Sequence, residues 1–214
     1  MSDIVIYGFP QSTYVRTARL ACEEKGVAYT LEPIEFGSPK HRALHPFARI
    51  PAIKHDELIL YETSAIVRYV DEAFDGPALQ PSDVVARARM DQWISAINDY
   101  YYAAMVRGII FQRLVNPQRG QPVDEGAVEA AVPQVEHQLG VAEQALSQTR
   151  FLAGDALSLA DLFLGPLIFW LAMTPEGGSA LKKTPAVSNW YETMATRASF
   201  AATLPPMPEQ SAAE

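Results

Sequence analysis

The stretch that decides the fold is Arg49–Phe74, which reads RIPAIKHDELILYETSAIVRYVDEAF. Two short apolar runs flank the polar segment His55–Glu57, and this pattern predicts a β-hairpin. Apolar residues then recur at spacings of one, three and four from Ala65 onward, which predicts an amphipathic helix. The stretch is therefore expected to fold as strand, turn, strand and helix.

Two features of this stretch indicate a binding site. Pro51 lies where a strand should begin, lacks an amide donor, and follows Ile50 across a bond that can be cis. Glu62, Thr63 and Ser64 lie where the second strand gives way to the helix, so a carboxylate, two hydroxyls and free helix amides meet there. Together these features predict a site for a short peptide with a free carboxylate. The alternative is a plain helix cap.

The composition is that of a globular protein of 214 residues, 49% hydrophobic and 20% charged. A net charge of −8 disfavours nucleic acid or an anionic membrane surface as a partner. The single cysteine, Cys22, excludes an internal disulfide and is expected to be a buried, unreactive thiol in a reducing compartment. Without a signal-peptide pattern or an unbroken apolar span, we expect a cytoplasmic protein. The four histidines lack metal-ligand spacing, so no metal is expected.

A β-α-β unit is expected ahead of the hairpin, and a crossover of its length favours parallel strands. Its helix has good N-cap residues at its start, in Gln11-Ser12-Thr13, and a glycine just past its end. The elements are placed at Ile4–Tyr7 (strand), about Tyr14–Lys25 (helix, followed by Gly26) and Val27–Ile34 (strand), with a polar connection at 36–47 that holds one helical turn.

The rest of the chain predicts helices only. Long helices are expected at Val84–Val115 and Glu125–Gln148, the second kinked or newly started at Pro133. Ser158 and Asp161 form a capping box that opens the most apolar helix, and Thr184-Pro185 starts the last clear one. The expected domains are residues 1–76, a linker at 77–83, a helical domain at 84–204 and a loose tail at 205–214.

Four motifs carry a family resemblance, in this order along the chain: YGFPQSTYVR, RIPAI, YETSAIVRY and FLAGDALSLADL. With them the chain resembles a cytosolic glutathione S-transferase over nearly its whole length. The segment PQSTYVR, together with RASF near the end, looks most like phi-type and related bacterial enzymes. The resemblance implies an α/β thioredoxin-like N-terminal domain (βαβ-ββα), an all-α helical C-terminal domain and a homodimer.

The resemblance implies that Ser12 is the catalytic residue and donates a hydrogen bond to the glutathione sulfur. Lowering the pKa of a free thiol from about 8.5 by about two units requires roughly 2.7 kcal/mol. A hydroxyl donor to a charged acceptor supplies about 1.5–3 kcal/mol, and a helix N-terminus adds up to about 2. Thr13, Tyr14 and Tyr7 are rival contacts to the sulfur. The alternative is that Ser12 only caps its helix.

Glutathione is the implied co-substrate, held largely by the stretch Arg49–Phe74. Ile50 would exchange backbone hydrogen bonds with the cysteinyl unit, Glu62 would accept the ammonium, and Thr63 would hold the γ-glutamyl carboxylate. The full set of expected glutathione contacts is Ser12, Lys40 (with His41 as the alternative cation), Arg49, Ile50, Pro51, Glu62 and Thr63. The second substrate, an apolar electrophile, is expected against Phe9, Phe36, Tyr101 and Met105, unless these residues only fill the core.

The implied function is a glutathione transferase of the detoxification kind, with peroxide reduction as a side activity. Two alternatives stay open: a glutathione-dependent disulfide reductase, lyase or isomerase on the same fold, and a non-enzymatic binding or interaction module. A serine rather than a cysteine at position 12 argues against thiol exchange through the protein. The joint presence of Ser12, Pro51 and Glu62 argues against a scaffold that binds no glutathione.

Overall fold

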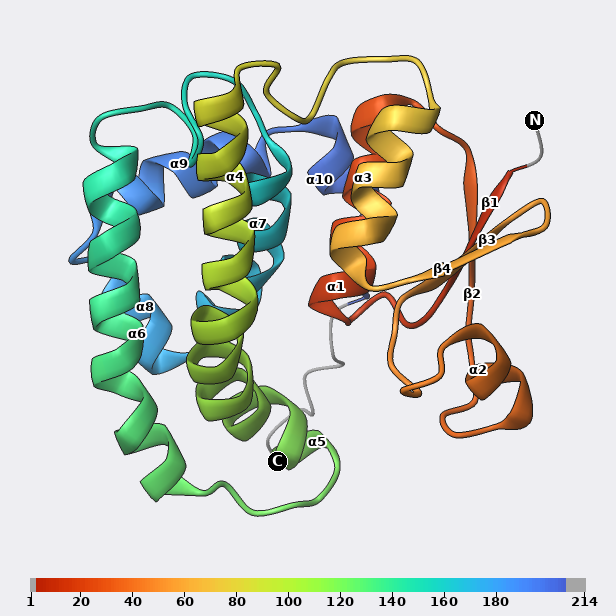
Figure 1. Cartoon of the computed structure of the whole chain (residues 1–214). Coiled ribbons are helices and arrows are strands. Elements are labelled where there is room, and N and C mark those ends of the chain that lie inside the picture. The colour runs from red at the N-terminus through yellow and green to blue at the C-terminus, as the bar shows by residue number, and fades with distance from the viewer. Residues whose placement is uncertain (1–2, 207–214) are drawn as a thin grey trace. The chain divides into compact units, whose positions relative to one another are not determined.

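The computed structural model describes residues 3–206 and divides the chain into two compact units. The first unit comprises residues 3–75 together with 198–206, and the second comprises 76–197 (Figure 1). This division differs from the expected helical domain at 84–204, because the last described helix, α10 (Ala198–Ala202), belongs to the first unit. Most of the expected tail at 205–214 lies outside the described residues.

The first unit contains a four-stranded mixed sheet in the order β2-β1-β3-β4. β1 pairs with β2 in parallel and with β3 antiparallel, and β3 and β4 form the expected hairpin. Ile4, Ile6 and Ile53 are fully buried, as the apolar pattern of a central strand predicts. The strands are β1 (Ile4–Tyr7), β2 (Tyr29–Glu32, shorter than expected), β3 (Ala52–His55) and β4 (Leu58–Tyr61).

Helices α1 (Thr13–Lys25) and α3 (Thr63–Ala73) lie side by side in this unit (Figure 1). Gly26 ends α1 in the left-handed conformation at φ 69°, which a glycine adopts without strain. A buried ion pair joins the two helices, with Lys25 Nζ at 3.2 Å from an Asp71 carboxylate oxygen. The expected helical turn before the hairpin is α2 (Pro39–Leu44), capped by Ser38.

The second unit contains helices only, as the sequence predicts. The long pattern from Val84 forms α4, which continues into the π-helical segment η1, and η1 ends at Val115 as expected. α6 runs through Pro133 without ending, so the expected new start at this proline is wrong. The helices are α4 (Val84–Ala96), η1 (Ile97–Val115), α5 (Asn116–Gln118), α6 (Glu125–Leu146), α7 (Leu159–Leu171), α8 (Pro175–Leu181) and α9 (Pro185–Ala195).

Helix α7 is buried along its whole length, and the expected capping box holds its first turn. Asp161 Oδ2 accepts hydrogen bonds from the amide and hydroxyl of Ser158, at 3.0 and 2.8 Å. Asp161 Oδ1 accepts from the amide of Leu152 and from the indole of Trp190, both at 3.0 Å. Burial nevertheless raises the pKa of this carboxyl above its ordinary value. Asp161 is therefore a structural residue, as the sequence predicts.

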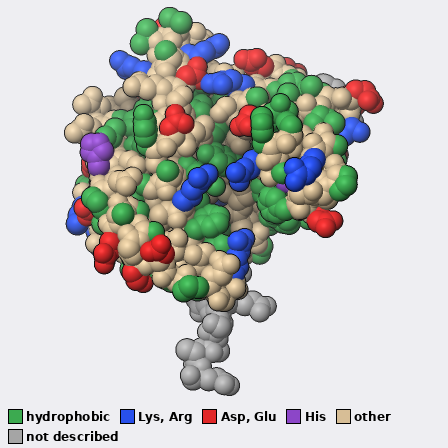
Figure 2. Space-filling view, turned by 60° about the horizontal axis from the view of Figure 1, so that its bottom comes forward, with side chains coloured by type: hydrophobic (Ala, Val, Ile, Leu, Met, Phe, Trp, Pro, Cys, Tyr) green, Lys and Arg blue, Asp and Glu red, His purple; other side chains and the backbone are tan. Residues whose placement is uncertain are grey.

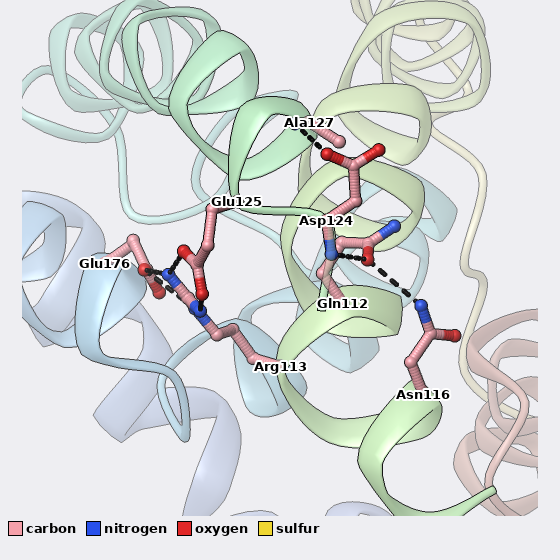
Figure 3. Close-up of polar contacts among 7 residues, drawn as sticks. All are labelled: Gln112, Arg113, Asn116, Asp124, Glu125, Ala127 and Glu176. Atoms are coloured by element: carbon pink, nitrogen blue, oxygen red, sulfur yellow. Dashed lines mark hydrogen bonds and ion pairs between the residues drawn. The ribbon is translucent and has the colours of Figure 1, made fainter. Parts of the chain in front are cut away.

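A polar network joins the end of η1 to the starts of α6 and α8 (Figure 3). Arg113 donates to both carboxylate oxygens of Glu125, at 2.7 and 2.8 Å, and to Glu176 Oε1 at 2.6 and 2.8 Å. Beside it, Gln112 Oε1 accepts from the Asn116 amide group and from the backbone of Asp124, both at 3.0 Å. These two neighbouring residues of η1 fix the loop between η1 and α6.

The face in Figure 2 carries basic and acidic side chains side by side, with hydrophobic side chains between them. Among residues 3–206, every helix is too short or too polar to cross a membrane.

Candidate functional site

The candidate site lies along the row of strand ends at which β1 finishes. We call this row of strand ends, which runs across the sheet, the edge of the sheet. Tyr7 pairs with Glu32 on one side and Ala52 on the other, and Ala52 pairs with Tyr61. Because this row crosses all four strands, the residues just beyond it come together at one edge. They are Gly8 after β1, Pro51 before β3 and Glu62 after β4, and the last two are positions that the sequence singled out.

Close packing at Gly8 fixes the loop that leads to Ser12. A Cβ added at Gly8 would lie 2.4 Å from a methyl carbon of Val15 and 3.4 Å from the Cβ of Ile50. Gly8 also has φ 157°, so only glycine fits between α1 and the segment before β3. The Ile50–Pro51 peptide bond is cis, the isomer that the sequence allows.

Ser12 caps α1, and its side chain is half-buried at this same edge. Its Oγ accepts one long hydrogen bond, 3.4 Å from the amide of Val15, and its backbone amide donates to the Phe9 carbonyl at 3.1 Å. A hydroxyl that accepts one bond still carries a proton to donate. Ser12 therefore combines a usable O–H donor with the positive end of a 13-residue helix.

The rivals to Ser12 are less accessible or are placed differently. Thr13 and Tyr7 are both buried, and Tyr14 is half-buried in the first turn of α1. The Lys40 ammonium lies 5.0 Å from the centroid of the Tyr7 ring, so a cation covers this aromatic face. Accessibility therefore favours Ser12 over Thr13 and Tyr7, and it does not distinguish Ser12 from Tyr14.

Glu62 adopts a strained backbone conformation at the start of α3, with φ 68° and ψ 115°. Its carbonyl accepts from the amides of Ala65 and Ile66, at 2.9 and 3.0 Å, while its exposed carboxylate makes no cap on the helix. The amides of Thr63 and Ser64 at the first turn are therefore oriented to receive an external anion. Strain at a non-glycine residue beside an anion-ready helix start is typical of a binding site.

The two candidate cations after β2 have different roles. His41 is buried, and its Nδ1 accepts from the amide of Gly37 at 3.1 Å, while its Nε2 donates to the carbonyl of Arg49 at 2.9 Å. Lys40 is exposed, with Nζ 3.5 Å from Glu32 at the end of β2. His41 thus holds the segment before Ile50, and Lys40 is the cation that can reach a ligand. Sequence reasoning missed this role of His41, for which residue type and spacing give no signal.

The residues expected around the second substrate fall in both units. Phe9 and Phe36 belong to the first unit, where their ring centroids lie 5.6 Å apart and Phe36 is 60% exposed. Tyr101 and Met105 are buried among the helices of the second unit. The Tyr101 hydroxyl donates to the carbonyl of Gln138 at 2.7 Å, and burial raises its pKa. Of these four expected residues, Phe36 with its neighbour Phe9 presents an exposed aromatic surface, whereas Tyr101 and Met105 do not.

Cys22 lies on the buried side of α1, and burial raises the pKa of its thiol to about 12. A thiol with this pKa is almost entirely protonated at neutral pH and is a poor nucleophile. Across residues 3–206, the His, Cys, Asp and Glu side chains form no cluster that could hold a metal ion. The groups that the described site does offer are hydroxyls, carboxylates, cations and backbone amides.

The fold is that of a protein with a thioredoxin-like first unit and an all-helical second unit. Residues 6–78 match the family model "Glutathione S-transferase, N-terminal domain", and residues 102–198 match "Glutathione S-transferase, C-terminal domain". The chain belongs to the glutathione S-transferase family.

Known relatives are similar to this chain, in sequence and in structure, along almost its whole length. Glutathione S-transferase 1 of Zea mays is 32% identical over 204 residues, covering 93% of this chain and 94% of the relative. The solved structure of glutathione S-transferase III in apo form superposes with a TM-score of 0.88 at 29% identity, covering 97% and 100% of the two chains. Glutathione S-transferase I from maize, in complex with an atrazine glutathione conjugate, has a TM-score of 0.86 at 31% identity, covering 94% and 96%. The expected similarity to phi-type enzymes is confirmed.

Proposed function

We propose that this glutathione S-transferase uses the Ser12 hydroxyl to stabilise the glutathione thiolate, which then attacks the carbon of an apolar electrophile. The observation that carries the proposal is the placement of Ser12, a half-exposed O–H donor at the N-terminus of α1 on the ligand-ready edge of the sheet. The maize relative supports conjugation, because it was solved in complex with a conjugate of glutathione and atrazine. Peroxide reduction by the same thiolate would be a side activity.

The energy required of Ser12 is modest. To lower the pKa of a thiol from about 8.5 by about two units, the site must favour the anion by roughly 2.7 kcal/mol. A hydroxyl donating to a charged acceptor supplies about 1.5–3 kcal/mol, and the first turn of a helix adds up to about 2. Ser12 can therefore act as a hydrogen-bond donor and need not be a nucleophile.

The same edge offers a partner for each charged end of glutathione. Glu62 would accept the γ-glutamyl ammonium, while the amides of Thr63 and Ser64 would bind the adjacent carboxylate. Ile50 would pair with the cysteinyl backbone beside Pro51, as a short added strand. Lys40 and Arg49, both exposed, would attract the glycyl carboxylate.

The electrophile would meet the thiolate beside the pair formed by Phe9 and Phe36. Phe9 belongs to the turn that leads into Ser12, since its carbonyl accepts the Ser12 amide at 3.1 Å. Two rings 5.6 Å apart, one of them largely exposed, provide a flat apolar surface for an aromatic or alkyl electrophile. This chemistry suits a role in detoxification.

A cytoplasmic homodimer is the proposed assembly. In the second unit, Val84 and Val85 at the start of α4 are 76% and 56% exposed. In the first unit, Phe47 is 70% exposed and lies with Tyr61 at a centroid distance of 6.3 Å. Phe47 and Tyr61 are both exposed and in ring contact, so they form an apolar surface that a second copy of the chain would cover. Analytical ultracentrifugation at micromolar concentration should give a dimer mass, and a monomer would contradict the assignment.

The test of the catalytic role compares Ser12→Ala with Thr13→Val and Tyr7→Phe. The thiolate of bound glutathione is titrated by its ultraviolet absorbance, and conjugation is followed with an activated aryl halide. Ser12→Ala should raise the thiol pKa by about one to two units and lower kcat/KM at pH 6.5 by about 10- to 100-fold, whereas the other two should change little. An unchanged midpoint with turnover intact in Ser12→Ala would assign the contact to another hydroxyl.

Retention on immobilised glutathione separates the alternative functions. Retention with conjugation supports the transferase, and retention without it supports a glutathione-dependent reductase, lyase or isomerase. A wild-type chain that flows through would be a non-enzymatic module.

A further inference from the structure

The C-terminal segment 198–203 returns to the first unit and docks on α1, the helix that Ser12 caps. It contains α10, which at five residues is far too short to be stable alone. Its position therefore depends on contacts with its neighbour. Those contacts come largely from two arginines of α1.

Arg16 is fully buried against this segment. Its Nε donates to the Thr203 hydroxyl at 3.3 Å and its Nη2 donates to the carbonyl of Phe200 at 3.1 Å. The guanidinium carbon also lies 4.1 Å from the centroid of the Phe200 ring. The fork shape of arginine allows these contacts at once, and lysine could make only some of them.

Arg19, three residues further along α1, extends the contact. It donates to the carbonyls of Thr203 and Ala202, both at 3.1 Å, which would otherwise be unsatisfied at the end of a helix. Ser199 completes the attachment by donating to the carboxylate of Glu24 on the same helix. We call these contacts of Arg16 and Arg19 with residues 198–203 the C-terminal clamp.

The clamp begins one helical turn from the catalytic hydroxyl. The Arg16 amide donates to the Ser12 carbonyl at 2.9 Å, so Arg16 is the first residue whose backbone bond closes the helix onto Ser12. On the other side, Val15 lies against Gly8 so closely that a Cβ there would come within 2.4 Å. The start of α1 is thus held between the loop 8–12 and the C-terminal segment.

We propose that Arg16 is a positioning residue: by clamping residues 198–203 onto α1, it fixes the N-terminus of that helix where the Ser12 hydroxyl meets the glutathione sulfur. The inference rests on the proposed function of Ser12. A hydrogen bond to a thiolate weakens steeply with distance and angle, so a small displacement of α1 reduces the stabilisation of the anion. The residues that hold the two ends of glutathione, such as Glu62, lie outside the clamp.

The test uses Arg16→Met, the milder Thr203→Val, and Lys25→Met as a matched control. Lys25 is also a buried cation of α1, but it pairs with Asp71 on α3 and not with the C-terminal segment. All three variants should lower the Tm. Only Arg16→Met and Thr203→Val should raise the thiol pKa of bound glutathione, by about 0.5–1 unit, which lowers kcat/KM at pH 6.5 by about three- to tenfold.

Two further measurements on Arg16→Met distinguish a displaced Ser12 hydroxyl from a general loss of structure. The activity of Arg16→Met should approach that of the wild type as the pH rises above the new thiol pKa, because solvent then removes the proton. Its dissociation constant for glutathione should change less than about twofold, since binding at the tripeptide ends is preserved.

The remaining outcomes overturn the proposal. An unchanged thiol pKa in both clamp variants, with a lower Tm, would make the clamp purely structural. An equal shift in Lys25→Met would show a general loosening of α1. A wild-type protein whose bound glutathione titrates like free glutathione would instead refute the role of Ser12.

Discussion

Glu62 combines backbone strain with a candidate ligand contact in one residue. A positive φ of 68° costs a residue with a side chain about 1–3 kcal/mol, and glycine avoids most of this cost. Such a conformation persists where the surrounding structure imposes it, here between the end of β4 and the first turn of α3. In this conformation Glu62 and the first amides of α3 lie together at the same edge of the sheet.

Two substitutions of Glu62 separate the effect of its backbone strain on stability from the effect of its carboxylate charge on glutathione binding. Glu62→Gln keeps the strained backbone and should weaken glutathione binding by about 10- to 100-fold, the equivalent of a lost charged hydrogen bond of about 1.5–3 kcal/mol. Glu62→Gly should weaken binding at least as much, yet be more stable to unfolding than Glu62→Gln, because it relieves the strain. Isothermal titration calorimetry and thermal unfolding measure the two effects. Glutathione affinity of Glu62→Gln equal to wild type would remove Glu62 from the site.

At the scale of single residues, the sequence predicted the position of a residue within its element better than the conformation of that residue. The helix-capping position of Ser12 and the junction at Glu62 follow from residue type and order. The positive φ of Glu62 and the buried, bridging role of His41 do not, because both are imposed by neighbours distant in the sequence. Spacing alone could not distinguish His41 from Lys40 as the exposed cation.

At the scale of elements, Gly108 marks the closest approach of two helices in the second unit. A Cβ added at this position of η1 would lie 2.5 Å from the Cβ of Ala131 on α6. This is well inside van der Waals contact, so η1 and α6 pack backbone to backbone here. This close contact between η1 and α6 can be tested by placing alanine at position 108 and glycine at position 131.

Gly108→Ala should destabilise the protein by about 1–3 kcal/mol, the usual cost of overpacking, although alanine is the better helix former. Adding Ala131→Gly should recover much of this loss, because the second substitution removes the clashing methyl group. Chemical denaturation of the two single variants and the double variant gives the coupling free energy. Additive effects would show that the two positions do not touch in the folded protein.

The helices and strands and their order along the chain were predictable, because apolar periodicity and capping residues are local signals. The β-α-β unit, the hairpin, α3 and the capping box before α7 all follow from them. The behaviour of Pro133 does not, since the burial of Val128, Val135 and Leu139 on α6 outweighs the local cost of a proline within a helix, about 3 kcal/mol. The π-helical winding of η1 likewise has no local signature in the sequence.

At the scale of the whole molecule, the network around Arg113 should govern acid stability. Hydrogen bonds from Arg113 hold the pKa of Glu125 and the pKa of Glu176 below their ordinary value of 4.5. A carboxyl whose pKa is lower in the folded state stabilises the fold above its unfolded pKa. That stabilisation is lost as the pH falls through the lower, folded pKa.

Arg113→Met should therefore reduce the free energy of unfolding most at neutral pH, with a gap to wild type that narrows as the pH falls below about 4.5. Lys183→Met is the matched control, because its ion pair with Glu136 is exposed at both ends and should contribute little at any pH. Denaturant unfolding from pH 7 to pH 3 measures both. A gap that does not change with pH would mean that the two carboxyls contribute nothing through their ionisation.

The division into a sheet-containing part and a helical part was predictable, since the apolar period changes near residue 80. The return of residues 198–203 to the first unit was not. Their attachment is made by side chains of α1 to backbone carbonyls, which every sequence possesses.

That return has a consequence for synthesis on the ribosome. The backbone and hydroxyl groups that accept the hydrogen bonds of Arg16 and Arg19 lie 183 to 187 residues further along the chain and are translated that much later. While the nascent chain grows, two buried cations of the first unit lack their eventual acceptors. The first unit is therefore completed only after the whole of the second unit has been translated.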